Sequence, residues 1–319
     1  MSCLSKLRSD VLIKTLRTDK GLTQDQLCLN ICTKDTLSRI ERSLHIPTWY
    51  IFEKLMLALG ENPYKYQYAE SVITIEDKRI VDSKANLKSL LQDNNEDNND
   101  KAERLIAQLE KDKSFNKEDE NRSFLWRQKA TLAFNRKRYD EAKEYAFGSL
   151  KISRLSFDES KINEVGRWVL SLGEIWAINQ IASIYLEKKM YENALVIFLG
   201  LKESIDNGYL EGDEKIRIYI SILYNITTSQ GLLKKHKDCL PFCDMGIELC
   251  TKYQYTYCHP LFLFNKSYNL LYLERFQEAE SYINKAFSLF YGLDRHLELE
   301  SGKNFLKKEF GNKISFFEF

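Results

Sequence analysis

The sequence predicts an all-α protein, and three observations support this fold class. Glycine (13 residues) and proline (4 residues) are scarce among 319 residues, whereas good helix formers such as Leu, Lys and Glu are abundant. Apolar residues make up 44% of the chain, which is enough to form hydrophobic cores. Apolar side chains recur at helical spacing, and helical hairpins repeat in the second part of the chain. We therefore expect helices throughout.

Residues 1–63 are predicted to form a small domain of four or five short helices. Gly21 ends the first helix, Thr23 caps the second and Thr33 caps the third. Gly60 ends the fourth helix, as glycine commonly does because it adopts positive φ without strain. The apolar residues expected to face inward are Leu7, Val11, Leu12, Leu16, Leu27, Ile31, Leu37, Ile40, Phe52, Leu55, Met56 and Leu59.

Residues 64–100 are predicted to be a connector. Residues 64–91 have a mostly helical pattern, although the β-branched residues from Ser71 to Ile75 leave a strand open as an alternative. The amide and acid run 92–100 has no apolar side chain to anchor it in a core. We therefore expect that run to be a solvated loop between helices.

Residues 101–319 carry a tetratricopeptide pattern, a 34-residue helical hairpin with small residues at places 8 and 20. The pattern recurs when Tyr139, Tyr191, His236 and Phe276 are set at place 17, and these anchors lie 52, 45 and 40 residues apart. The helices or loops are therefore longer than in the minimal repeat. The residues at places 8 and 20 are Ala130 and Ala142, Ala182 and Ala194, Thr227 and Cys239, and Ser267 and Ala279.

Such hairpins stack into a curved array with a concave face. Small residues at places 8 and 20 allow the two helices of a hairpin to approach closely. We expect a degenerate first repeat within residues 101–120 and a capping helix at residues 294–309.

The first 60 residues resemble the Cro-type helix-turn-helix family. The matching words are Gly21-Leu22-Thr23-Gln24, Leu37-Ser38-Arg39-Ile40-Glu41 and Ala58-Leu59-Gly60. The turn Asn30-Ile31-Cys32-Thr33 lacks the usual glycine and is one residue short. That departure is similar to the PlcR branch of the Rap, Rgg, PrgX and PlcR class of peptide-pheromone regulators, whose PlcR-like members join this domain to tetratricopeptide repeats.

The resemblance implies that the third helix binds double-stranded DNA in the major groove, with its early outward residues meeting base edges. It also implies a salt bridge between Arg17 and Glu41. Residues 1–42 hold eight Lys and Arg against five acids, and so modest a surplus favours a homodimer on an inverted-repeat operator. The predicted DNA-contacting residues are Gln24, Thr33, Lys34, Asp35, Thr36, Arg39 and Arg42.

Place 6 of the four repeats usually faces the concave groove and carries an amide every time. A primary amide offers both donors and an acceptor to the backbone of an extended peptide, so we expect a short signalling peptide in the groove. Places 5 and 9 add neighbouring groove residues. The predicted peptide-contacting residues are Arg127, Gln128, Asn179, Gln180, Tyr224, Asn225, Phe264, Asn265 and Tyr268.

Enzymes, metal sites and cofactors find no support in the sequence. It contains no phosphate-binding glycine loop, no Gly-x-Ser-x-Gly and no His-Glu-x-x-His. His236, Cys239 and Cys243 share one helix, but the repeat needs Cys239 and Cys243 for packing, so we expect no metal there. The seven irregularly spaced cysteines, with no signal peptide and no membrane span, predict a cytoplasmic protein with reduced thiols.

The sequence therefore predicts a peptide-controlled, DNA-binding transcription regulator acting in quorum sensing, and not an enzyme. A second hypothesis remains open, in which the repeats act as an adaptor or as an antagonist of a response regulator, like the Rap relatives. Those relatives carry a helical bundle in front, in place of the two helix-turn-helix words.

Overall fold

We describe the protein from a computed structural model that covers residues 9–311, except residues 30, 43, 46, 48, 62–74, 93, 155–156 and 209–211. The described residues form helices and no strand, so the predicted all-α class is confirmed. The chain divides into two compact units, Met1–Ala85 and Asn86–Phe319, with the boundary inside helix α5 (Ile75–Gln92). Each unit has its own core and is described separately.

The first unit contains four short helices around one core. They are α1 (Ser9–Asp19), α2 (Gln24–Cys28), α3 (Lys34–Glu41) and α4 (Trp49–Ala58). The inward residues predicted between Leu12 and Leu59 are buried except for half-buried Ile31, and Ile13, which was not predicted, is fully buried beside Leu12. The glycines that follow α1 and α4 adopt φ of +65° and +69° as expected. Leu7 lies outside the described residues, as does the side chain of Val11.

The connector differs from its prediction at the amide and acid run. Residues 75–91 are helical as predicted, Gln92 from the expected loop extends that helix, and residues 64–74 lie outside the described part. The run is not a loop over its whole length, because helix α6 (Glu96–Lys111) begins within it. The Asn95 side chain caps that helix by accepting a hydrogen bond from the Asn98 backbone N–H at 2.9 Å. Asn99 is buried and receives a hydrogen bond from Asn135 Nδ2 at 3.2 Å.

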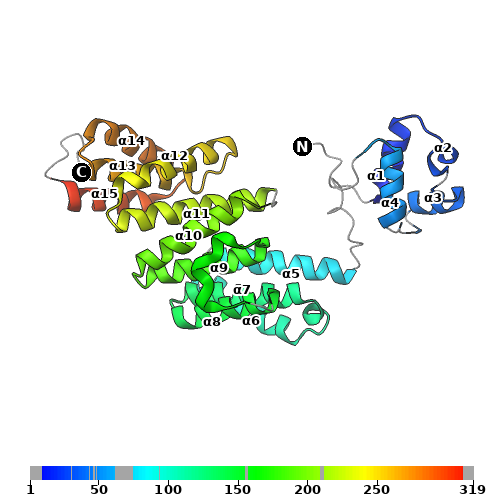
Figure 1. The fold of residues 1–319 in the computed structure, drawn as a ribbon, viewed down its shortest axis with the longest axis horizontal. Helices are drawn as coiled ribbons and strands as arrows, with labels where there is room; N and C mark the ends of the chain where they lie inside the picture. Colours follow the sequence, from blue (N-terminus) through cyan, green and yellow to red (C-terminus); the bar gives the residue numbers. More distant parts are fainter. Residues whose placement is uncertain are drawn as a thin grey trace. The chain divides into compact units, whose positions relative to one another are not determined.

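The second unit is a series of antiparallel helical hairpins (Figure 1). Each predicted anchor at place 17 is the first residue of the second helix of its hairpin. The two helices of each hairpin pack together, and the first helices of successive hairpins also contact one another. The hairpins are α7 (Asp119–Asn135) with α8 (Tyr139–Ser153), α9 (Leu172–Glu187) with α10 (Tyr191–Asp206), α11 (Asp213–Leu232) with α12 (His236–Lys252), and α13 (His259–Tyr272) with α14 (Phe276–Gly292).

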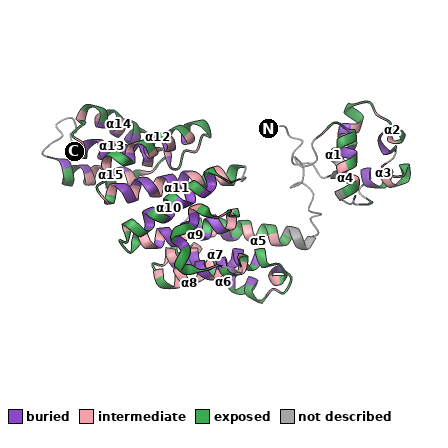
Figure 2. Ribbon diagram, viewed as in Figure 1, coloured by how far each residue is buried: buried purple, intermediate pink, exposed green. Residues whose placement is uncertain are grey.

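The small residues at places 8 and 20 lie where the two helices of each hairpin meet. All eight are at most 1% exposed, which confirms the packing role predicted for them. In the third hairpin the thiol of Cys239 lies 3.4 Å from the Thr227 backbone oxygen. Figure 2 shows buried residues on the sides of the helices that face other helices of this unit.

The turns inside the hairpins use a left-handed residue without glycine. Lys137, Lys189, Lys234 and Glu274 have φ between 59° and 61°, and each lies two residues before the next helix. The residue after each one donates its backbone N–H to the carbonyl oxygen five residues back, for example from Arg138 to the Ala133 oxygen at 2.8 Å. This is the Schellman arrangement, and its hydrogen bonds offset a strain of roughly 1 kcal/mol for each non-glycine residue.

Two additional segments account for the length of this unit. A 3₁₀ helix (Glu159–Arg167) packs on α10 and explains the 52-residue spacing between the first two anchors. Helix α15 (His296–Phe310) packs against α13 and α14, which confirms the predicted capping helix. Residues 101–120 belong to α6, a short 3₁₀ turn (Phe115–Lys117) and the start of α7.

Within the described residues, no single helix is long and apolar enough to span a membrane. One bent pair, Glu159–Arg167 with Leu172–Glu187, passes that test by length and composition only, and its apolar residues lie in the core of the second unit.

Candidate functional sites

Helices α2 and α3 of the first unit form a helix-turn-helix with both N-termini capped. Thr23 and Gln26 form a reciprocal capping box at α2, because each side chain bonds the other's backbone N–H. Thr33 caps α3 by accepting a hydrogen bond from the Thr36 backbone N–H at 3.1 Å. These caps define the start of the helix that carries the predicted base-contacting residues.

Helix α3 has one buried and one exposed face. Leu37 and Ile40 are fully buried in the core of the unit. On the other side Lys34, Asp35 and Arg39 are exposed, and the predicted residues Thr33 and Arg42 are exposed as well. Thr36 is half-buried, with its hydroxyl 2.8 Å from that of Thr33. The Lys34 ammonium binds the Asp25 carboxylate at 2.6 Å, and both side chains are largely exposed.

Arg17, Gln24 and Glu41 form a clamp between α1, α2 and α3. The Arg17 guanidinium donates two hydrogen bonds to the Glu41 carboxylate, at 2.6 and 2.9 Å, and a third to the Leu22 backbone oxygen at 2.7 Å. The Gln24 amide donates to the same carboxylate at 2.7 Å. The Arg17–Glu41 salt bridge predicted from the sequence is therefore present. The Gln24 side chain bonds within this clamp, and its contact with DNA stays a prediction.

The electrostatics of the clamp follow from this geometry. Burial raises the pKa of the Glu41 carboxyl, but the hydrogen bonds from Arg17 and Gln24 and the nearby positive charges outweigh that effect, and the net pKa is lowered. Glu41 is therefore ionised at neutral pH, and it holds the first three helices in one arrangement.

The predicted peptide-contacting residues lie on the first helices of the four hairpins, α7, α9, α11 and α13. Asn179 and Asn225 meet across α9 and α11, with Nδ2 of Asn225 lying 3.4 Å from Oδ1 of Asn179. Gln128 and Gln180 are half-buried, and their amides form no hydrogen bond with the described residues. These four amides lie along one series of neighbouring helices.

Asn265 is in a different situation from the other place-6 amides. It is only 6% exposed, and its Nδ2 donates to the Thr227 hydroxyl at 2.9 Å and approaches the Thr228 hydroxyl at 3.4 Å. Its amino group thus joins α13 to α11 within the protein. This pairing was not predicted from the sequence. The pattern that could have indicated it is a threonine at place 8 of one repeat followed by an amide at place 6 of the next repeat.

The predicted peptide-contacting residues on α11 and α13 include three aromatic side chains, Tyr224, Phe264 and Tyr268. Phe264 packs with Tyr268, Phe287 and Phe305 at ring-centre distances of about 6 Å. Tyr224 meets Phe262 edge to face at 5.9 Å. Burial raises the pKa of the Tyr224 and Tyr268 phenols, which stay neutral as hydrogen-bonding groups.

His236, Cys239 and Cys243, which have the residue types of a metal site, contact other protein groups in the structure. His236 Nδ1 lies 2.8 Å from the Asn269 amide oxygen, and its ring stacks on Tyr272. Cys239 and Cys243 are fully buried between helices. The described residues contain no group of three or more His, Cys, Asp or Glu side chains placed to hold a metal ion.

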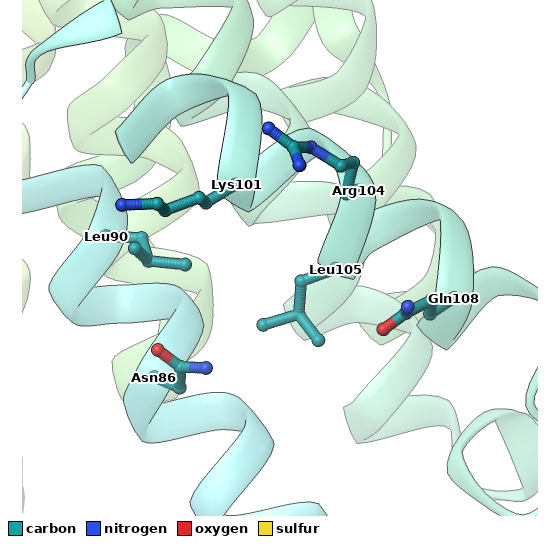
Figure 3. Close-up of a pocket in the computed structure, with 6 residues that line it drawn as sticks. All are labelled: Asn86, Leu90, Lys101, Arg104, Leu105 and Gln108. Carbon is teal, nitrogen blue, oxygen red and sulfur yellow. The ribbon is translucent and has the colours of Figure 1, made fainter. Parts of the chain in front are cut away.

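A separate open cavity of about 340 Å³ lies between α5 and α6 (Figure 3). Leu90 and Leu105 supply its apolar lining, Lys101 and Arg104 supply positive charge, and Asn86 and Gln108 complete it. Lys101 already binds Asp97 at 2.5 Å. None of the predicted peptide-contacting residues lines this cavity.

No family model and no curated protein matches this chain. Several solved structures, by contrast, do match the chain. Bacillus thuringiensis PlcR in complex with the peptide PapR7 and DNA aligns with a TM-score of 0.66 and 20% identity, over 92% of this chain and 98% of that one. ComR from S. thermophilus, in complex with DNA and its signalling peptide ComS, aligns with a TM-score of 0.56 and 20% identity, over 93% and 97%.

The pheromone receptor Rgg2 of Streptococcus dysgalactiae aligns with a TM-score of 0.55 and 14% identity, over 95% of this chain and 100% of that chain. The three alignments extend over both units. The chain therefore has the fold of the PlcR, ComR and Rgg receptors, as the sequence predicted.

Proposed function

We propose that this protein is a transcription regulator that binds double-stranded DNA through residues 1–63 and a short signalling peptide through residues 101–319. Residues 64–100 connect the two parts. In this proposal the protein acts in the cytoplasm as a homodimer on an inverted-repeat operator, in quorum sensing, and catalyses no reaction. The peptide occupies the groove formed by the first helices of the repeats.

The main support for this proposal is that one chain contains both a helix-turn-helix unit and a repeat unit. The capped helix α3 presents Lys34, Asp35 and Arg39 outward on a rigid core, which is the arrangement needed to read a major groove. The repeat unit offers two amides that form no hydrogen bond with the described residues, Gln128 and Gln180, on neighbouring helices. PlcR and ComR, which share the fold, were solved with DNA and a peptide bound.

Arg39→Ala and Lys34→Ala should weaken binding to the preferred DNA sequence by about 1–3 kcal/mol each where a base contact is lost. The preferred sequence is first obtained by selection from a random duplex pool, and we expect an inverted repeat. Binding is then measured by fluorescence anisotropy at two salt concentrations.

Lys54→Ala is the matched control, because it removes the same charge from an exposed position on α4. It should change affinity less than either α3 variant. Equal effects of all three substitutions, or selection of a single half-site bound by a monomer in light scattering, would contradict the proposed DNA-binding mode.

Gln180→Ala and Asn225→Ala should weaken peptide capture about five- to a hundredfold, because each leaves peptide backbone groups without a partner. The measurement is retention of a random octapeptide pool by the immobilised full-length protein, followed by mass spectrometry. Gln277→Ala, which removes an exposed amide from α14, should retain peptides as the parent does. If the Gln180 and Asn225 variants also match the parent, the amides do not contact peptide.

A further inference from the structure

Arg127 is the only charged side chain at the groove places of the four repeats. Places 5, 6 and 9 otherwise carry amides, hydroxyls and aromatic residues, and none carries an acid. Arg127 comes from α7, at the opposite end of the repeats from Phe264 and Tyr268 on α13. The groove is thus cationic at one end and aromatic at the other.

The guanidinium of Arg127 is held in place without an ion pair from the described residues. Its Nη1 donates to the Ser123 hydroxyl at 2.9 Å, and the group lies over the Phe124 ring at 5.8 Å. A guanidinium has five N–H donors, so several remain for a ligand. Burial lowers the pKa of Arg127, and the negative charges of Glu120 and Glu214 offset that effect only in part.

The carboxylates of Glu120 on α7 and Glu214 on α11 both attract the guanidinium by their charge. Glu214 of α11 binds Lys88 at 3.0 Å, and Glu174 of α9 binds Arg154 at 3.0 Å and caps its own helix. Gly173 in the first turn of α9 lets the guanidinium approach its backbone, since a Cβ there would lie 2.8 Å from Nη1. The N-terminal end of a helix adds positive potential, so the surroundings of Arg127 favour an anion.

We propose that Arg127 is the anchor for a carboxylate of the bound peptide, so that the ligand class is an acidic peptide. This inference rests on the proposed peptide-binding function and adds the charge that the groove selects. A planar guanidinium binds a carboxylate through two parallel hydrogen bonds, which selects by geometry as well as by charge. The carboxylate comes from Asp, from Glu or from a free C-terminus.

The test is peptide selection by the full-length protein from two random octapeptide pools, one with free and one with amidated C-termini. The parent should show an enrichment of about tenfold or more, either of peptides that carry Asp or Glu or of the free pool over the amidated pool. Arg127→Gln should lose that enrichment, and Arg127→Lys should keep part of it. Arg122→Gln, an exposed position on the same helix, should behave as the parent. Enrichment of peptides that carry Asp or Glu in the amidated pool assigns a side-chain carboxylate, whereas a preference for the free pool without such enrichment assigns the terminal carboxylate.

Peptide capture with neither enrichment of Asp and Glu nor preference for free C-termini, or equal selectivity of the parent and the Arg127→Gln variant, would overturn this inference and leave the proposed function standing. A parent that captures no peptide from either pool would overturn the proposed function and this inference together. Circular dichroism of each variant, with an unchanged thermal transition, separates lost selectivity from lost folding.

Discussion

Glu41→Gln is expected to destabilise the first unit by about 3 kcal/mol, because it removes the counter-ion of a nearly buried Arg17. The side chains of Arg17 and Glu41 are 13% and 3% exposed, so water cannot replace the lost carboxylate. Hydrogen exchange of the full-length protein measures this effect locally. Amides of α1 and α3 should exchange about a hundredfold faster than in the parent.

Asp35→Asn is the matched control, since it neutralises an acid on the same helix at an exposed position. Its effect should stay below about 1 kcal/mol. Equal exchange rates in the Glu41→Gln variant and the parent would show that the clamp contributes no stability.

The effect of Glu41→Gln should also depend on pH. The pKa of Glu41 in the folded protein is lowered from its ordinary value of 4.5, so its contribution is fully present above that value. The contribution is lost as pH falls through the lowered pKa, because the carboxyl becomes protonated. The difference in exchange between parent and variant should therefore shrink in acid. A difference that grows below pH 4.5 would contradict this sign.

Phe198→Ala is expected to lower the stability of the second unit by about 3–5 kcal/mol. Phe198 lies on α10, is fully buried, and belongs to the core shared by α7 to α11. Its removal leaves a cavity that neighbouring rigid helices cannot fill. Urea unfolding followed by circular dichroism measures the loss as a lower midpoint with an unchanged slope.

The adjacent residue provides the control for this prediction. Leu199 is 36% exposed, so Leu199→Ala should cost about 1 kcal/mol or less. Similar midpoints for the two variants would show that α10 does not pack as described. Because the first unit has a separate core, neither substitution should change hydrogen exchange in α3.

The repeat register was predictable from single residues because packing at a hairpin tolerates little variation. Ala182 and Ala194 are both fully buried where α9 meets α10, and a larger side chain at either position would separate the helices. The start of each second helix, such as Tyr191, follows from the same register. The predicted inward residues of the first unit, such as Leu37 and Ile40, follow from helical periodicity in the same way.

The loop predicted for residues 92–100 was wrong over part of its length because that prediction relied on composition alone. A polar run without apolar anchors was expected to be a loop, but a helix can begin in polar sequence when a side chain caps it. Asn95 provides that cap, and Asp100 and Glu103 then bind Arg136 at 2.5 and 2.9 Å. Arg136 lies directly after α7, more than thirty residues later in the chain, so no local sequence pattern predicts these ion pairs.

Residue patterns were enough to predict the helical class, the two kinds of unit, the repeat register and, through the family resemblance, the Arg17–Glu41 pair. Each of these depends on residue types at fixed spacing within a helix or a motif. Only the three-dimensional arrangement of the helices shows which of the predicted peptide-contacting side chains already have a hydrogen-bond partner. Asn265 and Gln180 occupy the same place in their repeats, yet the Asn265 amino group is engaged by Thr227 and Thr228 from another helix. Hydrogen bonds between helices depend on three-dimensional proximity, which spacing along the chain does not encode.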